Sequence, residues 1–398
     1  MTETALKRRI GPGLMTAYGV GVMVGAGIYV LIGAVAGLAG SYAPLAFLLA
    51  GLVAAPSALT YAELSARIPE AAGEAAYVAR AFGTTVLPVA IGLAIVLAGT
   101  VSGAAVLRGG VGYLTALVSV TPLWAIIGLG VALTLVAIAG VLESLTLAAL
   151  FTVIEVAGLL LVSGAGFLAE PVVVTAAETT PGSMAVLAAT ALAFFAFIGF
   201  EDVVNMAEEA RDPTRTMPRA IIASLLITAA LYAMVSFAAL RAVPPGDLAA
   251  SSRPLALVWE RATGQNAGFL AAIAVLAALN GVLAQLVMAA RVLFGLGRRA
   301  RIFAPFTHAH PRFGTPVLAT LTCGAALIGA ALALPVADLA EIAAMVLLAI
   351  FAAVNTSLIF IKLQSPSAPF RVPMAVPVLG LVAALAALAL SLAERIAS

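Results

Sequence analysis

Long apolar runs separated by short polar connections fill most of this chain. A helix that crosses a bilayer needs roughly 20 mostly apolar residues, and about eleven runs of that length can be recognised. The expected transmembrane helices are 14–40, 43–66, 84–107, 122–141, 144–168, 185–208, 218–240, 267–297, 315–334, 338–361 and 373–393. The pattern predicts an all-α polytopic membrane protein with no attached soluble domain. The two longest connections, 169–184 and 241–266, each have room for a short surface helix.

The composition supports the same class of protein. Of the 398 residues, 63% are hydrophobic and only 10% are charged, whereas a soluble protein carries about 25% charged residues. A soluble globule, a disordered chain and a collagen-like repeat are therefore excluded. Cys323 is the only cysteine, so a disulfide within the chain is impossible.

Basic residues distinguish the two ends of the predicted helices. Residues 1–13 include Lys7, Arg8 and Arg9, and we expect them to form a cytoplasmic N-terminus before an uncleaved first helix. Alternating the sides from there leaves five of the 20 basic residues outside, namely Arg108, Arg241, Arg253, Arg261 and Arg395. The other fifteen lie inside, as the positive-inside rule requires. Eleven helices then place the C-terminus outside.

Two of the predicted helices carry interruptions. The first is rich in glycine over residues 19–37, and the sixth reads Phe194-Phe195-Ala196-Phe197-Ile198-Gly199-Phe200-Glu201-Asp202. Interrupted helices at matching positions of two halves indicate a substrate site near mid-membrane. Five spans separate the first helix from the sixth, so the halves are inverted. Freed N–H groups suit a carboxylate and freed carbonyls an ammonium, which favours a zwitterionic substrate. The alternative is that the glycines only let helices pack closely.

Several motifs resemble those of the amino acid–polyamine–organocation (APC) superfamily of transporters. Their sequences are most similar to those of its bacterial cationic-amino-acid-transporter-like members. The motifs are Gly25-Ala26-Gly27-Ile28-Tyr29, Phe195-Ala196-Phe197-Ile198-Gly199-Phe200-Glu201, Asp212-Pro213-Thr214-Arg215, Tyr61-Ala62-Glu63-Leu64, Arg67-Ile68-Pro69-Glu70, His310-Pro311 and Thr315-Pro316. They extend over most of the chain in the order of the family. Twelve-helix members are common, so eleven helices would be a departure.

The resemblance implies a five-plus-five inverted repeat of the leucine-transporter-like fold, with helices 1 and 6 broken. Residues 14–168 would form the first repeat and 185–361 the second, with helix 11 at 373–393 outside them. Alternating access would expose a central amino-acid site to each side in turn. The implied carboxylate ligands are backbone groups around Gly25, Ala26, Gly27 and Ile28. The implied amine ligands are those around Phe195, Ala196 and Ile198, and Phe195 would be the gate that closes over the substrate.

Glu155 lies near the middle of the fifth predicted helix. A carboxylate at the bilayer centre costs about 2.5–3.5 kcal/mol, so it is a functional candidate. Many members of the family have a lysine here, in place of a sodium ion. Three interpretations remain open: a site that gains and loses a proton, a counter-charge for a cationic substrate, and a permanently protonated acid bonded to a helix 1 carbonyl.

Glu201 follows the break in the sixth helix and matches a pH-sensitive glutamate of arginine/agmatine antiporters. We therefore favour a role in proton coupling over a purely structural hydrogen bond. A sodium site is not expected, because the eighth helix has no Ser or Thr and its only uncharged polar side chains are Asn280 and Gln285.

The sequence thus predicts a sodium-independent, proton-coupled secondary active transporter of amino acids in the plasma membrane. The alternative is an exchanger of amino acids with amines or polyamines. The expected partners are a small amino-acid or amine substrate, protons and the bilayer, with no cofactor, metal or nucleic acid. An intramembrane enzyme is not expected, since the only histidines are His308 and His310 in a loop. Neither a channel filter nor a Walker-type loop is present. The oligomeric state is left open.

Overall fold

The computed structural model describes residues 10–25, 27–70, 73–139, 144–172, 182–310 and 315–397. The long helices are α1 (Pro12–Val24), α2 (Gly27–Ala39), α3 (Ala43–Arg67), α5 (Val86–Leu117), α6 (Pro122–Ala139), α7 (Ser144–Leu168), α9 (Ser183–Phe194), α10 (Pro213–Ala242), α13 (Gly268–Arg299), α14 (Val317–Ala333), α15 (Val336–Gln364) and α16 (Ala375–Ala397). Short helices are α4 (Gly73–Phe82), α11 (Pro245–Ala250) and α12 (Pro254–Thr263), with 3₁₀ turns at η1 (Gly40–Tyr42), η2 (Phe195–Phe197), η3 (Asp202–Glu209) and η4 (Arg301–Thr307). The predicted N-terminal segment lies mostly outside the described residues.

The all-α polytopic fold predicted from the sequence is confirmed. Helices lie at each of the eleven expected ranges, and α11 and α12 occupy the connection at 241–266. Within the described residues, nine helices are long and apolar enough to cross a membrane. That number is below eleven because helical turns run on from α2 into α3, giving one stretch over Leu31–Arg67, and because α14 has only 17 residues.

The third span is longer than its apolar run suggested. The prediction ended it at residue 107, before Arg108, whereas α5 continues to Leu117. The Arg108 side chain donates a hydrogen bond from Nη1 to the carbonyl oxygen of Ala331, at 2.7 Å. That carbonyl lies in the last turn of α14, where carbonyls have no partner within their own helix. Arg108 therefore provides a hydrogen-bond donor to a free carbonyl at the end of α14. Its charge does not terminate α5.

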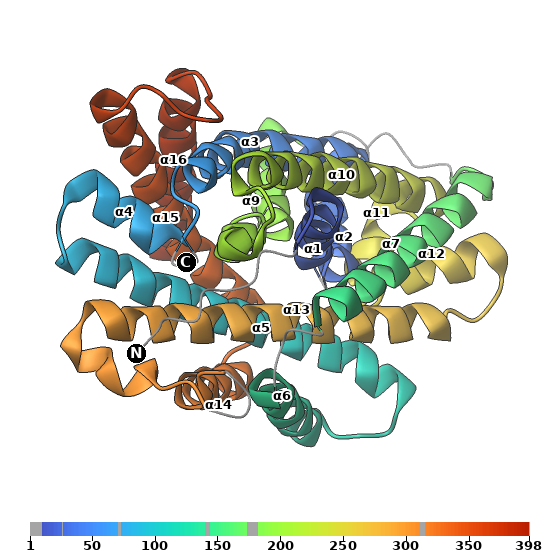
Figure 1. The fold of residues 1–398 in the computed structure, drawn as a ribbon. Coiled ribbons are helices and arrows are strands. Elements are labelled where there is room, and N and C mark those ends of the chain that lie inside the picture. Colours follow the sequence, from blue (N-terminus) through green and yellow to red (C-terminus); the bar gives the residue numbers. More distant parts are fainter. Residues whose placement is uncertain are drawn as a thin grey trace.

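Two pairs of long helices run side by side through the molecule (Figure 1). One pair is α5 with α13, and the other is α3 with α10. The broken first span, α1 and α2, lies against α10, α7 and α9. The apolar core is correspondingly divided into one cluster around α1, α2, α3, α9 and α10 and a second around α5, α6, α13 and α14. The broken helices thus lie within the larger cluster.

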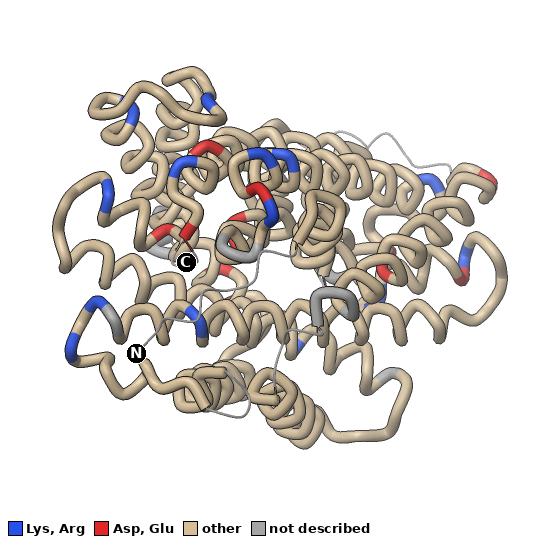
Figure 2. Tube along the Cα trace, in the orientation of Figure 1, with Lys and Arg blue, Asp and Glu red and all other residues tan. Residues whose placement is uncertain are grey.

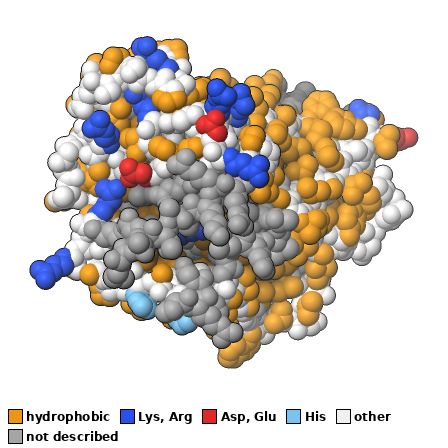
Figure 3. Space-filling view, viewed as in Figure 1, with side chains coloured by type: hydrophobic (Ala, Val, Ile, Leu, Met, Phe, Trp, Pro, Cys, Tyr) orange, Lys and Arg blue, Asp and Glu red, His pale blue; other side chains and the backbone are white. Residues whose placement is uncertain are grey.

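The outer surface is strongly apolar, as expected for a protein that contacts lipid. Leu161 on α7 is 53% exposed and Leu226 on α10 is 64% exposed. Figure 3 shows apolar side chains covering much of the right-hand part of the face in view. A soluble monomer rarely exposes such extended apolar areas. Figure 2 shows most Lys and Arg residues towards the side that holds the α15–α16 connection and the ends of α4 and α13.

A buried ion-pair network ties three segments together at that side. The Glu63 carboxylate on α3 is fully buried and accepts hydrogen bonds from Lys362 Nζ on α15, at 2.6 and 2.9 Å. Arg67 donates to the same carboxylate from Nε and Nη2, at 2.9 and 2.6 Å. The N–H of Val372, in the connection to α16, donates to it at 2.8 Å, while Lys362 donates to the Val372 carbonyl. Glu63 is therefore an anchor between helices.

We predict that replacing Lys362 by Met lowers the melting temperature of the purified protein in detergent. The change leaves part of a buried carboxylate without its partner, which typically costs about 3–5 kcal/mol. The matched control is Arg215→Met, because Arg215 forms an exposed pair with Asp212, and such pairs contribute about 0–1 kcal/mol. Equal melting temperatures for the two variants would contradict the prediction. The double variant Glu63→Gln with Lys362→Met should recover part of the loss.

Candidate functional site

The first helix is broken between α1 and α2. Gly25 has φ 21° and ψ −150°, a conformation that side chains strongly disfavour. Its N–H still donates to the carbonyl of Gly21, at 3.2 Å, which closes the last turn of α1. The chain then re-enters a helix at Gly27. Ala26, predicted as a substrate ligand, lies outside the described residues, whereas Ile28 is fully buried.

The sixth helix is broken just after Phe194, where α9 ends. A short 3₁₀ turn, η2, follows, and Ile198 is extended with φ −60° and ψ 133°. Gly199 has φ 128°, and a Cβ added there would lie 2.8 Å from Val22 Cγ1. This position therefore requires glycine both for its backbone conformation and for the close approach of α1.

The two breaks lie against each other. A Cβ added at Gly27 would lie 3.4 Å from the Cα of Ala196, so the start of α2 touches the interrupted part of the sixth helix. Ala196 and Ile198 are buried, and Phe195 is partly exposed between the two apolar clusters. The structure thus brings together Gly27, Phe195, Ala196 and Ile198, which the sequence resemblance implied as one site. Whether they bind a substrate stays a prediction.

Tyr232 on α10 joins the two breaks. Its buried hydroxyl lies 2.7 Å from the carbonyl oxygen of Met23 and 2.9 Å from that of Ala196, and donates to both. Its ring packs edge-on against Phe197, with centroids 5.2 Å apart. Sequence reasoning missed this residue. The available signal was a tyrosine inside an apolar helix, whose hydroxyl needs a partner once it is buried.

Glu155 lies on α7 and is fully buried. Its Oε1 accepts a hydrogen bond from Asn280 Nδ2 on α13, at 3.5 Å, and its backbone carbonyl accepts one from the Tyr29 hydroxyl, at 3.4 Å. Its Oε2 has no hydrogen-bond partner among the described residues. Tyr113 on α5 donates to the backbone carbonyl of Tyr29, at 2.7 Å. Glu155 therefore lies where α7 and α13 meet the start of α2.

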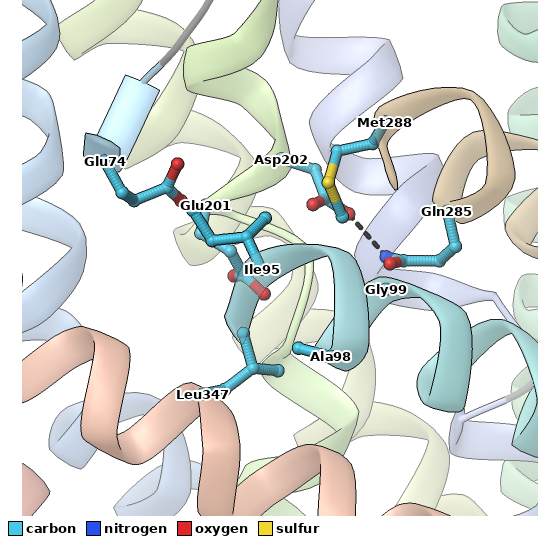
Figure 4. Close-up of a pocket in the computed structure, with 9 residues that line it drawn as sticks. All are labelled: Glu74, Ile95, Ala98, Gly99, Glu201, Asp202, Gln285, Met288 and Leu347. Carbon is cyan, nitrogen blue, oxygen red and sulfur yellow. Dashed lines mark hydrogen bonds between the residues drawn. The ribbon is translucent and has the colours of Figure 1, made fainter. Parts of the chain in front are cut away.

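Glu201 lies at a different place, in a small pocket beside the sixth-helix break (Figure 4). Its Oε2 accepts a hydrogen bond from the N–H of Gly199, at 2.9 Å. Its neighbour Asp202 accepts one from Gln285 Nε2 on α13, at 2.5 Å. A third carboxyl, that of Glu74 on α4, reaches the same pocket. Burial, assisted by the nearby Glu201 carboxyl, raises the pKa of Glu74 to about 8.

The remaining lining residues are apolar or small. They are Ile95, Ala98 and Gly99 on α5, Met288 on α13 and Leu347 on α15. Glu74 and Asp202 were not among the predicted site residues: Glu74 lies between two predicted spans, and Asp202, although it follows Glu201 in the interrupted sixth helix, was given no role. Asn280 and Gln285 on α13 entered the sequence analysis only in the argument that the eighth helix lacks the hydroxyl groups of a sodium site. In the structure each amide instead donates to a buried acid.

This architecture defines a polytopic helical membrane protein in which two interrupted helices meet inside the bundle. The chain belongs to the amino acid permease family, within the APC superfamily, because the model of that family matches residues 15–394. The predicted resemblance is thereby confirmed. The family and the relatives described below are transporters. The expectation that the chain is not an enzyme is thereby confirmed.

Several characterised relatives are similar to this chain. Cationic amino acid transporter 4 of Homo sapiens is 32% identical over 92% of this chain and 62% of its own length. The branched-chain amino acid permease BcaP of Bacillus subtilis is 34% identical over 49% of this chain and 42% of its own. A methylthioribose transporter of the same organism is 30% identical over 51% and 44%. The chain therefore spans less than two thirds of the length of these relatives.

We predict that Tyr232→Phe lowers the melting temperature, because the carbonyls of Met23 and Ala196 lose a shared buried donor. Leaving such a group unsatisfied costs about 1–3 kcal/mol. Tyr42→Phe is the matched control, since the Tyr42 side chain is 43% exposed. Differential scanning fluorimetry of both variants in one detergent makes the comparison. The assignment of Tyr232 as the link between the breaks fails if its variant melts together with the control.

Proposed function

We propose that this chain is a secondary active transporter of amino acids that works by alternating access. The observation that carries the proposal is the contact between the two helix breaks at Gly27 and Ala196, deep in the larger core cluster. Unwound backbone is tolerated at such a depth only where it faces protein or a cavity, and paired breaks are typical of midplane substrate sites. Membership of the amino acid permease family supports an amino acid as substrate.

In this proposal the backbone around Gly25, Ala26, Gly27 and Ile28 binds the substrate carboxylate. The segment of Phe195, Ala196 and Ile198 binds the amine, with Phe195 as gate. Residues 14–168 and 185–361 are the two inverted repeats, and 373–393 is an additional helix. The N-terminus is cytoplasmic and the C-terminus outside, in the plasma membrane. The concentration of basic residues at one side of the molecule supports this orientation.

Transport is proposed to be coupled to protons rather than to sodium. Glu155 is the first candidate for the coupling group, because it is buried between helices and one of its oxygens has no partner among the described residues. The groups that face it are the amide of Asn280 and the hydroxyls of Tyr29 and Tyr232. A carboxyl in such surroundings is easily neutralised by a proton. Glu201 is the second candidate.

We predict that Glu155→Gln abolishes the stimulation of amino-acid uptake by an inward proton gradient, while exchange between internal and external substrate continues. An amide has the shape of the protonated acid but cannot release a proton. The measurement is uptake of labelled amino acids into proteoliposomes with and without the gradient. Glu170→Gln is the control, because Glu170 is exposed just beyond the end of α7. Gradient-driven uptake by the Glu155 variant would exclude it as the coupling group. If the wild type exchanges internal for external substrate but its uptake does not respond to the proton gradient, the result would favour the alternative function, an exchanger of amino acids with amines or polyamines.

We predict that Gly27→Leu eliminates substrate binding. Even a Cβ at this position comes within 3.4 Å of the Ala196 backbone, so a leucine has to push the two breaks apart. Gly13→Leu is the matched control, because a Cβ at Gly13 has no neighbour within 4 Å. Binding of labelled amino acids to both purified variants is compared by scintillation proximity. Retained binding in the Gly27 variant would remove this segment from the substrate site.

A further inference from the structure

Asn205 on η3 is a buried amide without a hydrogen-bond partner. Its side chain is 3% exposed, and neither Oδ1 nor Nδ2 has a partner among the described residues. An asparagine amide carries two donors and an acceptor oxygen, and all of them are enclosed by protein here. Buried polar groups in native proteins are nearly always paired, so an amide that is left entirely unpaired calls for an explanation.

A second buried asparagine shows how the same protein satisfies such a group. Asn355 on α15 is fully buried, and its Nδ2 donates to Ser57 Oγ at 2.9 Å and to the Phe351 carbonyl at 2.8 Å. Its Oδ1 accepts a hydrogen bond from Thr60 Oγ1 at 2.7 Å. Packing between α3 and α15 therefore pairs both ends of one amide, whereas the surroundings of Asn205 pair neither end.

The segment that carries Asn205 has an unusual backbone. The 3₁₀ helix η3 is eight residues long, although such helices rarely exceed three or four residues and often mark a hinge when they are longer. Hydrogen bonds hold both of its ends. Asp202 accepts one from Gln285 on α13, and the N–H of Arg211 donates to the Ile10 carbonyl, at 3.0 Å. The middle of η3, where Asn205 lies, rests on the start of α4.

The contact with α4 is close but offers the amide no partner. Gly73 has φ 38°, and a Cβ added there would lie 3.0 Å from Val204 Cγ2 and 3.1 Å from Asn205 Oδ1. As a glycine, it has no side chain that could donate. Its N–H is already donated to the Glu70 carbonyl, at 3.1 Å. The two segments thus fit together tightly, and the fit leaves a polar group unsatisfied.

We propose that the contact between η3 and the start of α4 opens in each transport cycle, and that the unpaired Asn205 amide makes this opening easier. While the contact is closed, the amide has lost its water and gained nothing in return. Once the segments separate, water or a passing substrate can pair with it. The inference rests on the proposed transport function, in which α4 connects the second and third spans on the cytoplasmic side.

The test measures how often the contact opens, using a cysteine that reacts with a small water-soluble thiol reagent only when it is exposed. Cys323, the only native cysteine, is first replaced by alanine. Val204→Cys then places a reporter in η3, where the side chain is fully buried. Ala104→Cys on α5, equally buried but in the other core cluster, reports general loosening of the fold. Each reporter is combined with Asn205, Asn205→Leu and Asn205→Ala in the full-length purified protein.

We expect Asn205→Leu to slow labelling at the Val204 reporter, relative to the Ala104 reporter, by about tenfold, which corresponds to about 1.4 kcal/mol. Neither Asn205 variant has an amide that gains partners on opening. Asn205→Ala should show a smaller decrease, because the space that it leaves loosens the closed contact. Slower labelling in either variant supports the inference. Labelling at or above the parent rate in both variants would overturn it, even if the leucine proves too large for the site.

Thermal stability gives a second readout, with Asn355→Leu as the matched comparison. Asn205→Leu should raise the melting temperature by about 2 °C, since it removes an unpaired amide. Asn355→Leu should lower the melting temperature, because Ser57, Thr60 and the Phe351 carbonyl lose a partner. Equal decreases in the two leucine variants would overturn the inference.

Uptake of labelled amino acids into proteoliposomes connects the opening to transport. Asn205→Leu should reduce the uptake rate in parallel with the labelling rate. Unchanged uptake despite slower labelling would overturn the assignment of this opening to the transport cycle. A parent protein that takes up no amino acid, while labelling still depends on Asn205, would refute the proposed function and not the opening of the contact.

Discussion

Two of the buried acids in this protein, Glu155 and Asp202, accept hydrogen bonds from side chains of one helix, α13. Asn280 and Gln285 on α13 donate to Glu155 and Asp202, which belong to α7 and to the segment after the sixth-helix break. Burial of a polar group without a partner costs a few kcal/mol, so both contacts fix how α13 is rotated about its axis. Since α13 also runs along α5, this rotation determines which face the bundle presents to the broken helices.

Buried tyrosines provide the complementary half of the network. Helices that stop inside an apolar interior free carbonyl groups that water cannot reach. Tyr232 donates to carbonyls at the two breaks, those of Met23 and Ala196. Tyr29 and Tyr113 donate to carbonyls inside other helices, those of Glu155 and Tyr29. Glu155 and Asp202 therefore accept hydrogen bonds from side-chain amides, and these backbone carbonyls accept them from phenols. Together with the pair of Glu63 and Lys362, these contacts hold helices whose apolar surfaces alone would fit one another in many ways.

The fold was largely readable from the sequence, because apolar length and the glycine-rich stretch around Gly25 are local signals. The continuation of α5 past Arg108 was not, since it depends on a carbonyl of α14 that only folding brings near. The same limit applied to the candidate site. Gly27 and Ala196 were expected together through a family motif, whereas Tyr232 and Glu74 become meaningful only through contacts with distant segments. Burial and partner identity are properties of the assembled chain.

The hydrogen bond from Tyr232 to the Ala196 carbonyl has a consequence for the energetics of recognition. In the proposed transporter, a substrate amine that replaced this hydroxyl on the carbonyl would gain only the difference between the two hydrogen bonds. Under the proposed function, such an exchange would keep substrate binding weak and substrate release fast. The displaced hydroxyl can still donate to Met23. In the proposed transporter, Tyr232 would thereby couple occupancy of the sixth helix to the end of α1.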